Sequence, residues 1–148
     1  EIWSDSGGKI DFFVSGVGTG GTLTGVGTVL KERNPKVKII AIEPKDSSVL
    51  SGGSAGPHKI QGIGAGFIPK ILNIGLIDQI IKIDNDLAID PAKQVARLEG
   101  LPVGISSGAA LAGAEKIAKK SSSKGKRIVV IIPSFAERYM STALFDNL

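Results

Sequence analysis

The sequence contains no cysteine, a single histidine and only 5% aromatic residues. The lack of cysteine excludes a disulfide framework, a zinc ribbon and a thiol nucleophile within this chain. One histidine, His58, cannot supply a metal site that needs two imidazoles, and it argues against a Ser-His-Asp triad. There is no apolar run of about 18 residues and no signal-peptide pattern at the start. We therefore expect a soluble protein of the intracellular type.

What the sequence does contain suits one domain with a buried core. The chain has 148 residues, of which 42% are hydrophobic and 22% charged. Glycine is abundant, with 20 residues and no three-residue period, so the glycines are expected in turns or close backbone approaches. The net charge of +4 comes from lysines scattered along the chain, which indicates ordinary solubility charge. We expect neither a nucleic-acid partner nor a membrane.

Buried apolar runs alternate with helical segments along the chain. Strands are predicted over residues 9–15, 37–42, 78–83 and 127–132, and helices over residues 22–33, 86–98 and from Ser106 or Ser107, as N-cap, to about 120. This alternation predicts the α/β class: a doubly wound, mostly parallel sheet with helices on both faces. Ligands bind such sheets beyond the carboxyl ends of the strands, where helix N-termini point. Two loops meet that condition, one after the first strand and one before the Ser106 helix.

The glycine-rich segment after the first strand predicts a phosphate site. It lies between a buried strand and a helix, the context that gives a glycine pattern its meaning. Glycines let the backbone approach a ligand, and the helix N-terminus adds free N–H groups with a partial positive charge. Two threonine hydroxyls add donors. The segment consists of Gly18, Thr19, Gly20, Gly21 and Thr22.

A dinucleotide site is the competing interpretation of the same segment. Gly16, Gly18 and Gly21 satisfy G-x-G-x-x-G, and Glu43 ends the next strand at the distance expected of a carboxylate that binds a ribose hydroxyl. The additional threonines and Gly20 favour one terminal monophosphate instead. Spacing alone does not reject the dinucleotide, so a nicotinamide dinucleotide-binding domain stays open here.

The serine pair Ser106-Ser107 follows Gly104-Ile105 and precedes a run of small residues. One interpretation makes one serine an ordinary helix N-cap. The other places one hydroxyl at the same end of the sheet as the glycine-rich segment, where it could bond a ring nitrogen of a ligand without supplying a full charge.

Taken together, four motifs resemble the cysteine synthase family, also called O-acetylserine (thiol) lyase. They are residues 18–22, 57–69, 104–108 and 137–139. The family belongs to the fold-type-II enzymes that use pyridoxal 5′-phosphate (PLP). The resemblance runs over essentially all 148 residues but covers only the C-terminal half of such an enzyme, so we expect residues 1–148 to be that half, without the N-terminal half that carries the Schiff-base lysine.

The resemblance implies a role for each motif. Gly18 to Thr22 would hold the PLP phosphate, and Ser106 would bond the pyridine nitrogen. The mouth of the active site would be lined by Gln61, Gly62, Ile63 and Gly64. The implied reaction removes acetate from O-acetyl-L-serine and adds sulfide to give L-cysteine. A cytoplasmic homodimer is expected, with an organellar form left open, and no catalytic residue is expected within this chain.

The family also implies a protein partner. Cysteine synthases commonly bind the C-terminal tail of serine acetyltransferase through a basic loop, and His58 and Lys59 match that loop. Ser54 and Ala55 stand where a lysine and a proline are common, so the basic patch is thinner here. A plain solvated loop is the alternative for this pair.

Three further alternatives stay open at the level of sequence. The first two are the related enzymes β-cyanoalanine synthase and cysteine desulfhydrase. Ile63 and Ala65 resemble cysteine synthase more than β-cyanoalanine synthase, whereas a cysteine desulfhydrase can share this segment. A non-catalytic remnant that keeps the fold without the lysine is the third.

Overall fold

The structure, a computed structural model, describes residues 1–145 and contains a four-stranded parallel sheet in the order β3-β2-β1-β4. The strands are β1 (Phe12–Gly16), β2 (Lys38–Pro44), β3 (Gln79–Ile83) and β4 (Ile128–Val130). All three strand pairs are parallel. The expected α/β class and parallel sheet are confirmed.

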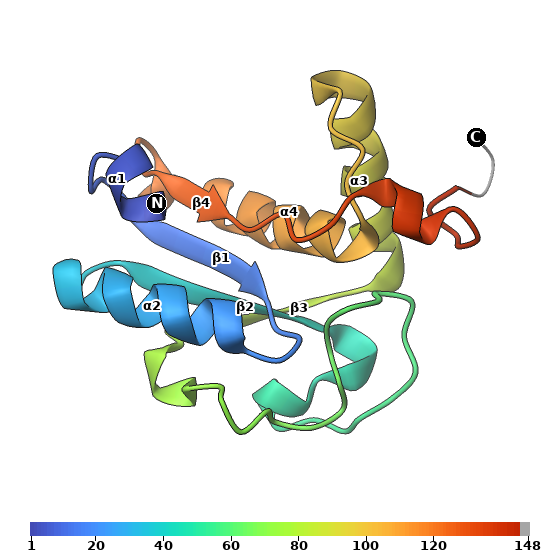
Figure 1. Cartoon of the computed structure of the whole chain (residues 1–148), viewed down its shortest axis with the longest axis horizontal. Coiled ribbons are helices and arrows are strands. Elements are labelled where there is room, and N and C mark those ends of the chain that lie inside the picture. Colours follow the sequence, from blue (N-terminus) through green and yellow to red (C-terminus); the bar gives the residue numbers. More distant parts are fainter. Residues whose placement is uncertain (146–148) are drawn as a thin grey trace.

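Helices cover both faces of the sheet, as expected (Figure 1). They are α1 (Ile2–Asp5), α2 (Gly21–Arg33), α3 (Asn85–Glu99) and α4 (Ile105–Ala118). Successive strand residues point to opposite faces, and the core divides accordingly. Val14 and Ile42 belong to the cluster that includes α3 and α4, whereas Phe13 and Ile39 pack with α2. All four positions need apolar residues because both faces of the sheet are covered, which explains the continuous apolar runs in the sequence.

The start of α4 differs from the sequence prediction. The N-cap is Gly104, and the helix begins at Ile105, so neither Ser106 nor Ser107 caps it. The amide of Gly104 donates to the Ser134 carbonyl at 2.9 Å, and the amides of Ser107 and Gly108 donate to the Gly104 carbonyl. The N-cap prediction is therefore wrong, because a contact from a distant loop sets the start of the helix. Both serines lie in its buried first turn.

Asp78, just before β3, ties the start of β2 to α2. Its carboxylate lies 2.7 Å from the Lys31 ammonium and 3.0 Å from that of Lys38, and it accepts the Ile39 amide at 2.8 Å. Burial alone raises the pKa of Asp78, but the hydrogen bonds from Lys31, from the Ile39 amide and from Lys38 outweigh it and hold the pKa below its ordinary value of 3.8. The charged form is therefore stabilised by folding.

We expect Asp78→Asn to lower the free energy of unfolding at pH 7 by about 1 kcal/mol, since it removes the charge from a carboxylate that bonds two lysines and a backbone amide at the surface. Because the pKa is lowered in the folded state, this contribution is present above about pH 4 and is lost as the pH falls through the folded pKa. Urea unfolding at pH 7 and pH 3 measures both effects, with Asp90→Asn on the exposed side of α3 as the control. A difference that stays the same at pH 3 would contradict the assignment.

Candidate functional site

The glycine-rich loop leaves the carboxyl end of β1 and enters α2. The Val17 amide donates to the Ile42 carbonyl at 3.2 Å, so the start of the loop is bonded to the adjacent strand β2. Gly20 is the N-cap of α2 and has a φ of +85°, the left-handed conformation that favours glycine. This puts the N-terminus of α2 at the sheet edge predicted from the sequence.

The amides of this loop are available to a ligand. Within residues 1–145, the N–H groups of Gly18, Thr19 and Gly20 donate to no protein acceptor, and no side chain caps α2. Thr19 and Thr22 are exposed, so their hydroxyls can add to the donor set. Unpaired amides at a helix N-terminus, together with the helix dipole, form an anion site. The geometry therefore supports the phosphate prediction.

A second segment, residues 61–64, packs directly on the loop. A Cβ placed on Gly18 would lie 2.5 Å from the Gly62 carbonyl oxygen, so only glycine allows this approach. The Gly64 amide donates to the Val17 carbonyl at 3.1 Å. On its other side, a Cβ on Gly62 would lie 3.9 Å from the Ser106 Oγ. The structure thus brings together three predicted segments that are about 40 residues apart in sequence.

The two serines of α4 have different surroundings. Ser106 is 3% exposed, and its hydroxyl has no protein hydrogen-bond partner among the described residues. Ser107 is fully buried and its hydroxyl donates to the Ser134 carbonyl at 3.5 Å. Of the two hydroxyls, only that of Ser106 is free to bind a ligand near Gly62.

Glu43 does not act as a dinucleotide carboxylate. It is 1% exposed and accepts the amides of Leu50 and Ser51 at 2.9 and 3.1 Å, together with the Ser51 hydroxyl. These bonds use both carboxylate oxygens to hold the short helix η2 (Val49–Ser51). The dinucleotide interpretation thereby loses the group that would bind the ribose.

Comparison with known proteins shows the family to which the chain belongs. Residues 1–134 match the family described as "Pyridoxal-phosphate dependent enzyme". The chain belongs to this family. It is 55% identical over 140 residues to cysteine synthase of Staphylococcus aureus, an alignment that covers 95% of this chain and 45% of the relative. The chain therefore spans less than half the length of the curated relatives it matches.

Solved structures support the same fold. The crystal structure of cysteine synthase from Entamoeba histolytica is 48% identical, with a TM-score of 0.97 over 99% of this chain and 44% of that chain. A hydrogen sulfide-producing enzyme from Fusobacterium nucleatum is 38% identical, with a TM-score of 0.88 over 93% of this chain and 47% of that chain. The fold-type-II assignment is confirmed.

The residues present fit the cofactor of this PLP-dependent family. The free amides of Gly18, Thr19 and Gly20 form a cradle for a phosphate. Glycine is needed in this cradle, because a Cβ on Gly18 would collide with Gly62 and a Cβ on Gly20 would collide with Leu72. The hydroxyl of Ser106, which has no protein partner among the described residues, lies close to Gly62. A terminal phosphate and a ring nitrogen on one ligand require both kinds of donor.

The predicted mouth residues are divided between surface and core. Gln61 and Gly62 are exposed, and Gly64 is half-buried with a φ of +67°. The Ile63 side chain is 7% exposed and packs toward Gly16, where a Cβ would lie 2.9 Å from it. Ile63 therefore anchors this segment in the core while its neighbours face outward.

The two residues predicted to bind a partner protein, His58 and Lys59, also differ in their exposure. Lys59 is exposed, whereas His58 is half-buried and both of its ring nitrogens are engaged within its own loop. Sequence reasoning missed Asn85, which accepts the Lys59 amide at 2.7 Å and donates to Asp46 at 2.9 Å. The only signal for Asn85 was its place at the start of a predicted helix.

Sequence reasoning also missed what holds the start of α4. The Ser134 and Tyr139 hydroxyls hydrogen-bond at 3.0 Å, and a Cβ on Gly104 would lie 2.4 Å from the Ser134 Oγ. The available signal was the motif at residues 137–139, which contains Tyr139. These contacts fix the turn that presents Ser106.

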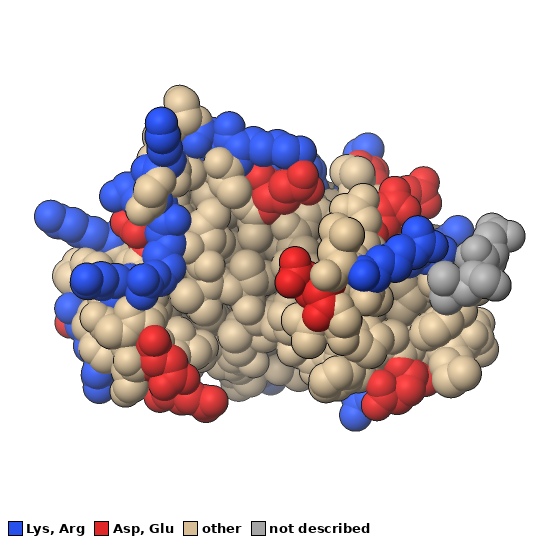
Figure 2. Space-filling view, turned by 90° about the horizontal axis from the view of Figure 1, so that it is seen from above, with Lys and Arg blue, Asp and Glu red and all other residues tan. Residues whose placement is uncertain are grey.

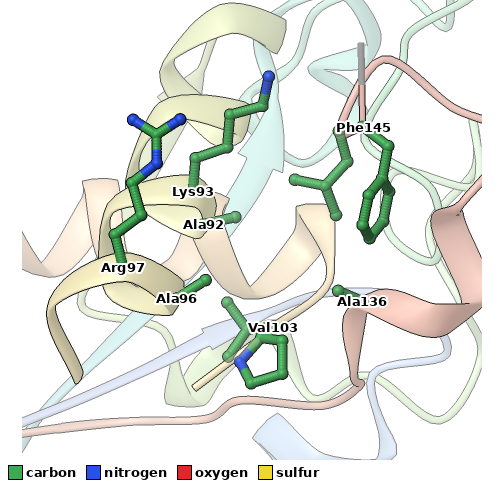
Figure 3. A pocket seen from close by; sticks show the side chains of 9 residues that line it. Ala92, Lys93, Ala96, Arg97, Val103, Ala136 and Phe145 are labelled. Carbon is green, nitrogen blue, oxygen red and sulfur yellow. The ribbon is translucent and has the colours of Figure 1, made fainter. Parts of the chain in front are cut away.

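Other surfaces lie apart from this site. An apolar cavity of about 100 Å³ lies between α3 and the C-terminal segment, with Lys93 and Arg97 at its rim (Figure 3). Figure 2 shows Lys and Arg gathered mainly toward one end of one face, with Asp and Glu side chains near its centre and at its other end. Within residues 1–145, no cluster of three possible metal ligands occurs, and no helix has the length and apolarity to cross a membrane.

Proposed function

We propose that this chain forms the phosphate- and ring-binding part of a cysteine synthase, which converts O-acetyl-L-serine and sulfide into L-cysteine and acetate. The observation that carries the proposal is the convergence of the Gly18–Gly20 amides with the free Ser106 hydroxyl across Gly62. The 55% identity to the S. aureus cysteine synthase supports the choice of reaction. The Schiff-base lysine and the loop that binds the substrate carboxylate would come from the part of the relatives that this chain does not match.

PLP, when bound, supplies the electron sink for loss of the β-substituent of the amino-acid substrate. The residues of this chain bind the cofactor and set the strength of its electron sink. The amides of Gly18, Thr19 and Gly20, with the N-terminal dipole of α2, bind the phosphate and fix the position of the ring. Ser106 donates a hydrogen bond from a neutral hydroxyl to the ring nitrogen. Because a serine transfers no proton there, the sink is moderate, which favours elimination and replacement at the β-carbon. Residues 61–64 pack on the loop and hold it in position.

The partners and compartment are part of the same proposal. We infer a cytoplasmic homodimer that binds the C-terminal tail of a serine acetyltransferase. The exposed Lys59 supports the last point through its charge, since a peptide C-terminus is an anion. The His58 ring supports it less, because its nitrogens are used within the loop.

A hybrid enzyme tests the proposal. In the S. aureus cysteine synthase, the 140 matched residues are replaced by those of this chain, so that the relative supplies the remainder. We expect the hybrid enzyme to retain PLP and to form L-cysteine from O-acetyl-L-serine and sulfide. A folded, PLP-containing hybrid enzyme that forms no L-cysteine would refute the proposal.

Sulfide release from L-cysteine is the second candidate activity. It is favoured by the likeness to the hydrogen sulfide-producing enzyme of F. nucleatum. The same hybrid enzyme decides between the two, because L-cysteine as the sole substrate yields sulfide only in this second case. Lead acetate or methylene blue detects that sulfide.

We expect Ser106→Ala in the hybrid enzyme to lower turnover by about 10- to 100-fold, the worth of one hydrogen bond to a ligand in a buried site, while PLP content stays near that of the parent. Steady-state rates and the absorbance of bound PLP measure the two quantities. Ser107→Ala is the matched control, since it removes the adjacent hydroxyl that donates to Ser134. Unchanged turnover in Ser106→Ala would mean that this serine is structural only.

A further inference from the structure

The His58 ring joins the two ends of a short segment. The Ile60 amide donates to its Nδ1 at 3.2 Å, and its Nε2 lies 3.1 Å from the Gly64 carbonyl oxygen. Since Nδ1 accepts a hydrogen bond, the proton of the neutral ring is on Nε2, and Nε2 donates to Gly64. A single side chain thereby fixes both sides of the turn that contains Gly62.

That turn needs to be fixed. Gly62 and Gly64 have φ angles of +91° and +67°. Glycine reaches such conformations easily but also leaves them easily, so each must be held by its surroundings. The ring packs on Gly64 closely enough that a Cβ there would lie 2.9 Å from Nε2. His58 therefore selects one conformation of this turn among several.

The selected conformation is the one that meets the glycine-rich loop. The Gly64 amide donates to the Val17 carbonyl, and the Gly62 carbonyl lies against the Cα of Gly18. Gly18 is the first of the three residues whose amides are free for a phosphate. The contacts run from the His58 ring through Gly62 and Gly64 to the anion site.

We propose that His58 is a positioning residue for the cofactor phosphate: its ring holds residues 60–64 so that Gly62 braces the Gly18–Gly20 amides. The inference rests on the PLP site of the proposed function. It gives His58 a role within the chain, in place of a role as a direct contact for a partner protein.

The neighbouring residue provides the matched control. Lys59 is exposed, and its backbone amide, not its side chain, bonds to Asn85. Lys59→Ala therefore removes a charge from the same loop and leaves the backbone tie in place. His58→Asn is a conservative variant, since an asparagine side chain can still accept a hydrogen bond from the Ile60 amide, two residues further along the chain. It loses only the bond to Gly64.

The test is titration of the apo hybrid enzyme with PLP. We expect His58→Ala to raise the apparent Kd about 10-fold, as for two lost hydrogen bonds, with His58→Asn in between and Lys59→Ala unchanged. In the 148-residue chain alone, amide hydrogen exchange at Gly64 is expected to accelerate in His58→Ala and not in Lys59→Ala. Unchanged exchange in β1 confirms that the variant is folded.

The outcomes separate this inference from the proposed function. An active hybrid enzyme in which His58→Ala binds PLP as tightly as the parent overturns the role of His58 and leaves the function standing. A hybrid enzyme that binds PLP but makes no L-cysteine overturns the function, and its Kd values still decide the role of His58. A parent hybrid enzyme that binds no PLP overturns both.

Discussion

Gly18→Ala is expected to weaken PLP binding by the hybrid enzyme by about 100-fold. The new Cβ would lie 2.5 Å from the Gly62 carbonyl oxygen, a backbone atom that cannot turn aside as a flexible side chain can. Residues 61–64 and the glycine-rich loop must therefore separate, at a cost of about 1–3 kcal/mol. The free amides are then no longer held in the arrangement that a phosphate requires. Titration of the apo protein with PLP, followed by absorbance, measures the effect.

The control for this substitution is Gly25→Ala. Gly25 is exposed in the middle of α2, and a Cβ there meets nothing within 4 Å. We expect PLP binding to stay unchanged in Gly25→Ala and the free energy of unfolding to rise by about 0.5–1 kcal/mol, since alanine is the better helix former. Equal PLP affinity in Gly18→Ala and the parent would contradict the packing described for Gly62.

Gly108→Ala is expected to cause the largest loss of stability in the chain, about 2–4 kcal/mol. A Cβ at this position of α4 would lie 1.9 Å from the Ala88 carbonyl oxygen and 2.9 Å from the Ala92 Cβ. The helices α3 and α4 would have to move apart along the face that buries Ala109. Urea unfolding of the 148-residue chain measures the loss, again beside Gly25→Ala. Wild-type stability in Gly108→Ala would show that these helices adjust without cost.

The fold could be predicted from the sequence because its signals are local. Buried parallel strands need continuous apolar runs, and the helices between them end at recognisable residues such as Asn34 before Pro35. The glycine-rich loop was predicted for the same reason, since Gly18 and Gly20 serve needs of the backbone itself. The observed strand boundaries differ from the predicted ones by up to three residues. β1 begins at Phe12, directly after Asp11, whose carboxylate accepts the Arg127 amide.

The details that sequence reasoning missed depend on contacts between distant segments. The Ser106 hydroxyl is free because Gly104, held by the Ser134 carbonyl, takes the capping position. The Glu43 carboxylate is bonded to Ser51, so it is not free to bind the ribose of a dinucleotide, and this contact favours the phosphate interpretation. The bond between His58 Nε2 and the Gly64 carbonyl joins a turn in which Gly64 has a positive φ. None of these facts follows from residue spacing.

The position of β4 has a consequence for synthesis on the ribosome. β1 is made well before β4, yet one of its edges pairs with β4, and the bond from the Arg127 amide to Asp11 spans 116 positions. Until β4 has been made, that edge of β1 lacks this partner, so β1 is open to pairing with another nascent chain. Pairing along this edge waits for β4, and such a contact between distant segments forms slowly during folding. The charged Asp11 at the start of β1 is well placed to discourage wrong pairing during this delay.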